Sequence, residues 1–98
     1  MPSVSIEFHP EAVAEAQAAR MWYDARSQTA SRSFVAELDR AIAEIGESPN
    51  RWPQYVEGTR RFLFRRFPFM VVYRVRPDRI QILAVAHARR KPAYWKQR

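Results

Sequence analysis

The sequence predicts an α+β protein that folds as one domain over residues 1–98, with its elements in the order β-α-α-β-β-β. Three observations predict this class. The chain opens with a short alternation of apolar and polar residues, continues with two segments of helical periodicity, and then has three segments rich in β-branched and aromatic residues. A chain of 98 residues can bury a single modest core.

The first strand and the first helix are expected to follow one another directly. Apolar residues alternate with polar ones at Val4, Ile6 and Phe8. Pro10 then precedes a helix expected over residues 11–25, because proline suits the first helical turn. One stripe of this helix consists of small residues and a tyrosine: Ala12, Ala16, Ala19 and Tyr23. Such a stripe favours close packing against another element.

The second helix is expected over residues 30–45. Its apolar residues recur at helical spacing, at Phe34, Leu38, Ala41, Ile42 and Ile45. Gly46 is the expected stop, because glycine commonly follows the last turn of a helix. The short connection predicts that the two helices form an antiparallel hairpin packed on one face of the sheet.

Three strands are expected after a loop over residues 47–59. The first alternates around Phe62 and Phe64 and ends at a turn or bulge marked by Pro68. The second, residues 69–75, is almost entirely apolar, as in a central strand covered on both faces. A tight turn at residues 76–79 leads into the third strand, residues 80–86, and a basic, aromatic tail follows it.

Charge is divided unevenly along the chain. Residues 1–50 contain four Arg and eight acidic residues, a net charge of −4, whereas residues 51–98 contain eleven Arg, two Lys and two acidic residues, a net charge of +11. A polycationic half predicts an anionic partner, either nucleic acid or an acidic protein segment.

Several classes are excluded or not indicated. The chain has no cysteine, so disulfides and thiolate metal ligands are excluded. Its two His residues and scattered acidic residues lack metal-ligand spacing, and its two Gly residues form no phosphate loop, so we expect no metal and no cofactor. No secretion signal and no membrane-spanning stretch is recognisable, which predicts a cytoplasmic protein without a membrane partner.

The whole chain resembles the RelE/ParE superfamily, the toxins of bacterial type II toxin–antitoxin systems. The resemblance is carried by FHPEAVAEA with WYDA, FVAELDRAIAEI, the strand FPFMVVYRV and the ending ILAVAHARRKPAYW, in that order. It implies a twisted antiparallel sheet with a helical hairpin on one side and a basic concave face on the other. It also implies a cognate antitoxin that neutralises the toxin and so relieves growth arrest.

Two activities within the superfamily remain open for this chain. ParE-like members act on DNA gyrase, and this activity is slightly favoured, because the helical hairpin is long and no carboxylate base accompanies the basic residues. RelE-like members cut ribosome-bound mRNA without a metal. Whether the chain is an enzyme therefore stays undecided at this stage, as does a third and less favoured reading, a plain nucleic-acid-binding module.

The resemblance assigns candidate site residues. Under the ribonuclease reading the catalytic residues would be Arg65, His87, Arg89 and Tyr94. These would supply a cation for the phosphorane and groups for proton transfer. Antitoxin and target would compete for a basic surface made of Arg61, Arg65, Arg74, Arg89 and Arg90. The alternative is structural: His87 would cap a strand, and Tyr94 with Trp95 would close the end of the core.

Overall fold

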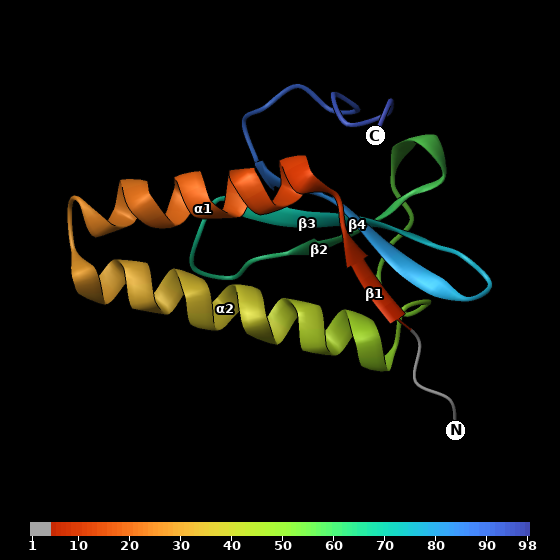
Figure 1. The fold of residues 1–98 in the computed structure, drawn as a ribbon, viewed down its shortest axis with the longest axis horizontal. Coiled ribbons are helices and arrows are strands. Elements are labelled where there is room, and N and C mark those ends of the chain that lie inside the picture. Colours follow the sequence, from red (N-terminus) through yellow and green to blue (C-terminus); the bar gives the residue numbers. More distant parts are fainter. Residues whose placement is uncertain (1–4) are drawn as a thin grey trace.

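The computed structural model describes residues 5–98 and shows the predicted α+β class, with two helices on one side of a four-stranded sheet (Figure 1). The elements are β1 (Ser5–Phe8), α1 (Pro10–Asp24), α2 (Gln28–Glu47), a 3-10 helix (Val56–Gly58), β2 (Arg60–Leu63), β3 (Phe69–Val75) and β4 (Arg79–His87). The order β-α-α-β-β-β is therefore confirmed. Val4, expected in the first strand, lies outside the described residues.

The sheet is mixed, which corrects the expectation of a purely antiparallel sheet. Its strand order is β1-β4-β3-β2. The β3 strand pairs antiparallel with both neighbours, whereas β1 runs parallel to β4, with Ile6 opposite Ile80. The helical hairpin carries the chain from β1 to β2 at the opposite edge of the sheet, and β3 and β4 follow as antiparallel neighbours, so β4 comes to lie beside β1 in the same direction.

Both helices begin at side-chain caps. His9 Nδ1 accepts a hydrogen bond from the Glu11 N–H at 3.1 Å, and Ser27 Oγ accepts one from the Ala30 N–H at 3.2 Å. These bonds satisfy N–H groups that have no partner within the helix.

Gly46 does not stop the second helix, because α2 continues through it to Glu47. A Cβ atom at position 46 would lie 3.2 Å from Cδ1 of Ile6. The glycine therefore lets the last turn of α2 approach β1 closely, and this packing role replaces the predicted role as a helix stop.

The main core lies between the helices and the first face of the sheet. Phe34 of α2 is fully buried at its centre. Its ring contacts four other aromatic rings, with centroids 5.2 to 5.6 Å away: Tyr23, Phe64, Phe67 and Phe69. Edge-to-face and stacked pairs of this kind stabilise a core beyond the area that they bury. The helices therefore hold the first face mainly through aromatic packing.

A second, smaller core lies on the opposite face of the sheet. It is formed by Met70, Val72, Leu83, Ala84, Ala86 and Trp95. The chain after β4 crosses this face (Figure 1), and Trp95 is 1% exposed there, stacked on Tyr55 at 5.7 Å between ring centroids. The centre of the face implied to be basic and concave is thus apolar and covered, and its cations lie around the covered area.

The predicted turns have the expected positions. The chain bends between β2 and β3 around Pro68, and the Arg76 N–H donates to the Arg79 carbonyl at 2.8 Å in the tight turn before β4. Within residues 5–98, neither helix is long and apolar enough to cross a membrane.

Candidate functional site

The predicted site residues lie in three places. The first group follows the course of the chain out of β4 and consists of His87, Arg89, Arg90 and Tyr94. Arg65 lies in the turn between β2 and β3, at the same end of the sheet, where the Ala88 N–H donates to the Pro68 carbonyl at 2.7 Å. Two separate segments of the chain therefore meet at this end.

Arg61 and Arg74 form the third group, on the strands themselves. Arg61 is opposite Val72 in the β2–β3 register, and Arg74 follows Val72 by two residues, so all three side chains lie on the second face. The Arg61 guanidinium lies 4.5 Å from the ring centroid of Tyr55. These two arginines therefore border the area that the tail covers.

The turn that carries Arg65 is fixed to α2 rather than to the tail. The N–H groups of Arg65 and Arg66 both donate to Oε1 of Glu37, the second at 3.1 Å. The side chain of Arg65 stays exposed. Within residues 5–98, no hydrogen bond joins Arg65 to the residues after β4.

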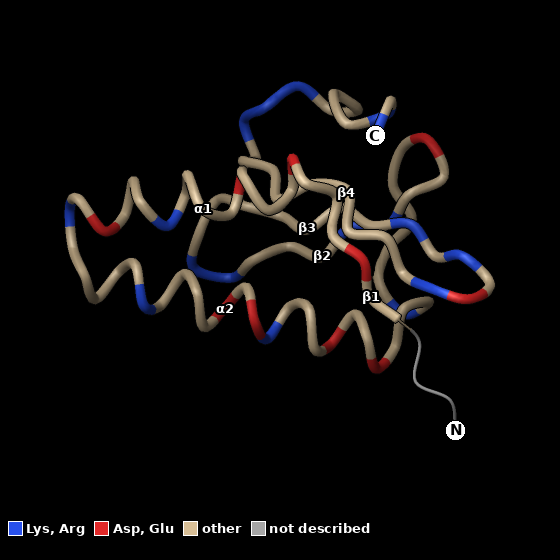
Figure 2. Tube along the Cα trace, viewed as in Figure 1, with Lys and Arg blue, Asp and Glu red and all other residues tan. Residues whose placement is uncertain are grey.

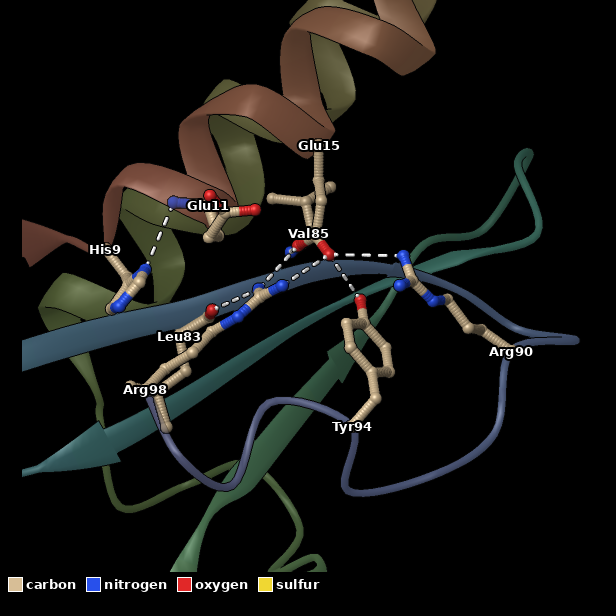
Figure 3. Close-up of polar contacts among 8 residues, drawn as sticks. All are labelled: His9, Glu11, Glu15, Leu83, Val85, Arg90, Tyr94 and Arg98. Atoms are coloured by element: carbon tan, nitrogen blue, oxygen red, sulfur yellow. Dashed lines mark hydrogen bonds and ion pairs between the residues drawn. The ribbon is translucent and has the colours of Figure 1, made fainter.

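The residues after β4 are gathered by one carboxylate that the sequence analysis did not single out. Glu15 projects from α1 toward the tail (Figure 3). It accepts a hydrogen bond from the Tyr94 hydroxyl at 2.7 Å and bonds from both Arg98 nitrogens at 3.0 and 3.1 Å. The Arg90 guanidinium reaches it at 3.5 Å. We call Glu15, Tyr94, Arg90 and Arg98 the tail cluster.

The tail cluster also closes an edge of the sheet. The short β1 leaves the later part of β4 without a neighbouring strand, and Leu83 is unpaired opposite β3 because the register shifts there. Arg98 donates to the Leu83 carbonyl at 2.9 Å, and Glu15 accepts from the Val85 N–H at 3.0 Å (Figure 3). An ion pair thus takes the place of a strand and satisfies an otherwise open edge.

Burial and the tail cluster together raise the pKa of the Tyr94 hydroxyl. Burial raises the pKa of its hydroxyl well above the ordinary value, and the hydrogen bond to Glu15 raises the pKa further, while Arg90 and Arg98 lower it by less. The hydroxyl is therefore a protonated donor at neutral pH. His87 is also engaged, because its Nδ1 accepts from the Arg89 N–H at 3.1 Å. This bond caps the end of β4.

An apolar groove lies beside the tail cluster, between α1 and the end of β4. Its volume is about 490 Å³. Ala18, Trp22 and Val85 line its wall, and His87, Arg90 and Glu15 line its polar end. Trp22 is 53% exposed, and the Arg26 guanidinium covers its ring at 3.7 Å. A large aromatic side chain left this accessible beside a groove is typical of a binding surface.

In the part of the chain that the structure describes, no three His, Asp or Glu side chains are grouped closely enough to hold a metal ion. The polar chemistry available is hydrogen bonding and charge from Arg90, His87 and the exposed cations around them. This arrangement can bind an anionic or amphipathic chain at its surface.

Sequence reasoning missed Glu15 and Arg98, although a signal for Glu15 was present. Glu15 lies three residues after Ala12 and four before Ala19, so it shares the stripe that was expected to be buried. A carboxylate on a buried stripe needs a cationic or hydrogen-bonding partner. Which cation supplies that partner is not visible locally, because Arg98 lies 83 residues away.

Comparisons with known proteins agree with this architecture. Residues 6–92 match the family described as "ParE toxin of type II toxin-antitoxin system, parDE". A solved structure titled "Chromosomal ParDE TA system from P. aeruginosa" superimposes with a TM-score of 0.76 at 22% identity, over 87% of this chain and 96% of that one. No curated protein matches the sequence significantly. At this identity the superposition establishes the fold alone, and the family match carries the relationship.

Proposed function

The chain belongs to the family of ParE toxins of type II toxin–antitoxin systems, and from this premise we propose that it inhibits DNA gyrase. The observation that carries the proposal is the family match, which covers residues 6–92 and so includes both helices, β1 from its second residue, the other three strands and the start of the tail. The superfamily placement made from the sequence is confirmed by this match. ParE-like members of the superfamily act on gyrase, and the expected result here is arrested supercoiling and growth.

The geometry around the tail supports this target over mRNA cleavage. A ribonuclease would need groups free to move protons at one phosphate. The Tyr94 hydroxyl instead donates a hydrogen bond to Glu15 at 2.7 Å, and His87 Nδ1 accepts a hydrogen bond from the main-chain N–H of Arg89. The backbone turn that carries Arg65 is bonded to α2, and among residues 5–98 no hydrogen bond joins Arg65 to His87 or Tyr94. These engagements favour a binding surface rather than a catalytic centre.

A purified gyrase assay tests the proposal. Relaxed plasmid, gyrase and ATP are incubated with the chain, and we expect loss of supercoiled product as the chain is titrated. The double variant Arg89→Gln/Arg90→Gln should require at least tenfold more protein, because it removes two cations next to the groove. The matched control Arg32→Gln/Arg40→Gln removes two cations from α2 and should inhibit like the parent.

A ribosome-dependent assay tests the alternative function, cleavage of ribosome-bound mRNA. Translating ribosomes with a defined mRNA are mixed with the chain, and the mRNA should stay intact. Codon-spaced cleavage together with normal supercoiling would reject gyrase as the target and establish the ribonuclease reading. Intact mRNA together with normal supercoiling would reject both targets.

Membership in a toxin–antitoxin family implies a cognate antitoxin, and we propose that its toxin-binding segment occupies the groove between α1 and β4. The apolar wall with the exposed Trp22 suits apolar side chains, and Arg90 at the polar end suits an acidic one. Apolar anchors flanked by a matched charge are the usual design of such an interface.

A substitution at Trp22 tests where the antitoxin binds. Trp22→Ala should weaken antitoxin binding about 30-fold, the scale expected for a central interface tryptophan. Met21→Ala is the matched control, because Met21 is adjacent and 62% exposed but does not line the groove. Isothermal titration with the purified cognate antitoxin measures both. Equal affinities would place the antitoxin elsewhere.

A further inference from the structure

We propose that Glu15 is a positioning residue, one that holds the segment 88–98 across the second face and so presents Arg89, Arg90 and Lys91 to the toxin's target. The inference rests on the proposed function only in assuming that the toxin binds its target through this surface. It assigns a role to a carboxylate on α1 that itself lies largely out of contact with any partner, because the Glu15 side chain is 13% exposed.

The first step of the argument concerns what Glu15 connects. Its carboxylate receives donors from β4 and from three tail residues, over sequence separations of 70 to 83 residues. The Tyr94 hydroxyl donates at 2.7 Å, a short distance typical of a hydrogen bond to a carboxylate, and Arg98 donates to both carboxylate oxygens at 3.0 and 3.1 Å in a two-bond pairing. One side chain thus joins the helix layer, the sheet edge and the tail.

The second step concerns charge. Residues 88–98 contain three Arg and two Lys and no acidic residue, so the tail repels itself unless another element supplies a negative charge. Glu15 supplies it from α1. Arg98 is matched closely to Glu15 and is equally buried, whereas Arg90 lies at 3.5 Å and remains 56% exposed. Arg90 is therefore oriented by the carboxylate and by the Tyr94 ring, 3.9 Å away, but stays accessible to an anionic partner.

The third step concerns what else holds the tail. Trp95 packs in the second core, yet its buried indole N–H has no hydrogen-bond partner among the described residues, and Ala93 adopts a left-handed conformation with φ of 68°. Both features oppose docking, since an unpaired buried donor and a left-handed alanine are each unfavourable. These two features therefore offset part of the stabilisation that apolar packing gives to the docked tail. The hydrogen bonds and ion pairs of the tail cluster supply the rest.

Hydrogen exchange measured by mass spectrometry tests the position of the tail. In Glu15→Gln the peptides covering residues 88–94 should exchange at least tenfold faster, while those covering β3 should be unchanged. Arg98→Gln and Tyr94→Phe should show smaller increases, and they keep the test decisive if Glu15→Gln does not fold. Glu11→Gln is the matched control, because Glu11 lies one turn earlier on α1, is exposed and makes no side-chain contact with the tail.

The salt dependence of tail exchange distinguishes a tail held by ion pairs from a tail whose packing is loosened in general. Raising the salt to 1 M should speed tail exchange modestly in the parent chain, since screening weakens the Glu15–Arg90 pair, whose arginine is 56% exposed, more than the buried Glu15–Arg98 pair. It should have little further effect in Glu15→Gln, where the ion pairs are already absent. Unchanged tail exchange in folded Glu15→Gln, or an equal salt response in both chains, would overturn the inference.

Growth arrest links the position of the tail to function. Glu15→Gln should need at least tenfold more inducer to stop growth, at matched protein levels, and Glu11→Gln should behave like the parent. Faster tail exchange with full growth arrest would overturn the positioning role. If the parent arrests growth without inhibiting supercoiling, the gyrase proposal fails, while the contrast between the two glutamate variants still decides this inference.

Discussion

The two faces of the sheet are covered in different ways. The helices cover the first face with a network of rings around Phe34, whereas the second face carries small and medium apolar residues under a single tryptophan, Trp95. The helical cover is continuous regular structure, while the tail has neither a helix nor a strand. The first face therefore carries most of the stability, and the second can be specialised for binding.

The net charge also differs between these two sides of the molecule. Along α1 and α2 acidic residues outnumber the arginines interspersed among them, and cations follow β4 into the tail (Figure 2). Glu15 is the point where the two meet, because its carboxylate faces the cations of the tail. The uneven charge seen along the sequence thus becomes an uneven charge in space, as expected of a protein with an anionic partner.

Removing the central ring of the first face should have the largest effect. Phe34→Ala should lower the free energy of unfolding by about 3–5 kcal/mol, because it removes a fully buried ring and leaves a cavity. Urea denaturation followed by circular dichroism measures the change. The neighbouring Val35→Ala, at a partly exposed position, should cost less than about 1 kcal/mol. Similar losses for the two variants would contradict the central role of Phe34.

Removing the main cover of the second face should cost less and act locally. Trp95→Ala should lower stability by about 3 kcal/mol, the low end for a buried aromatic residue, because the indole N–H is already unpaired. Hydrogen exchange should show the tail opening while β3 stays protected. Trp22→Ala removes an exposed tryptophan and should change stability by less than about 0.5 kcal/mol. A global loss of protection in Trp95→Ala would show that the two faces are not separable.

The smallest effect is a pH dependence on the first face. Tyr73 is buried and donates to the Pro49 carbonyl at 2.6 Å, and burial raises its pKa to about 12, although Arg60 lowers it slightly. In the unfolded chain the pKa is about 10, so the unfolded state releases this proton first as pH rises. The contribution of the Tyr73 hydroxyl to the free energy of unfolding is therefore fully present below pH 10 and is lost between pH 10 and about 12.

Tyr73→Phe should flatten this dependence. Its free energy of unfolding should fall less steeply than that of the parent between pH 10 and 12, as measured by urea denaturation at each pH. Comparison with the parent isolates Tyr73 from Tyr94, whose pKa is raised in the same direction in both chains. Equal slopes would mean that the Tyr73 hydroxyl is not shielded.

The spacing of apolar residues predicted the helices and strands well, because helices and strands have different hydrophobic periods. The apolar run at residues 69–75 is the central strand β3, and the Phe34–Ile45 spacing is the buried stripe of α2. The prediction that Gly46 ends the second helix was wrong, because glycine can either end a helix or permit a close approach. Only the contact with Ile6 decides between these two roles. The parallel pairing of β1 was missed for a similar reason, since it depends on a strand far away in the sequence.

The candidate site was predicted in its cations but not in its organisation. Arg90 and Tyr94 were singled out because the resemblance to the RelE/ParE superfamily places functional residues near these positions. Their common partner, Glu15, lies on a helix whose alanine-rich stripe predicts close packing rather than an ion pair. Contacts that join the two ends of a chain leave no local spacing to read, so this part required the structure.

The span of the tail cluster has a consequence for the order of folding. The helical hairpin and the β3–β4 hairpin close short loops, whereas the Glu15–Arg98 contact closes a loop of 83 residues. Pairing of β1 with β4, which joins Ser5 to Arg79, closes most of this loop and brings α1 beside the start of the tail, so the Glu15–Arg98 contact should form after the helices and the sheet are in place. Stopped-flow refolding should show the tail gaining protection last. A newly made toxin would then form its folded core before it forms the surface that we propose binds the target, and a cognate antitoxin present during folding would encounter the folded core first.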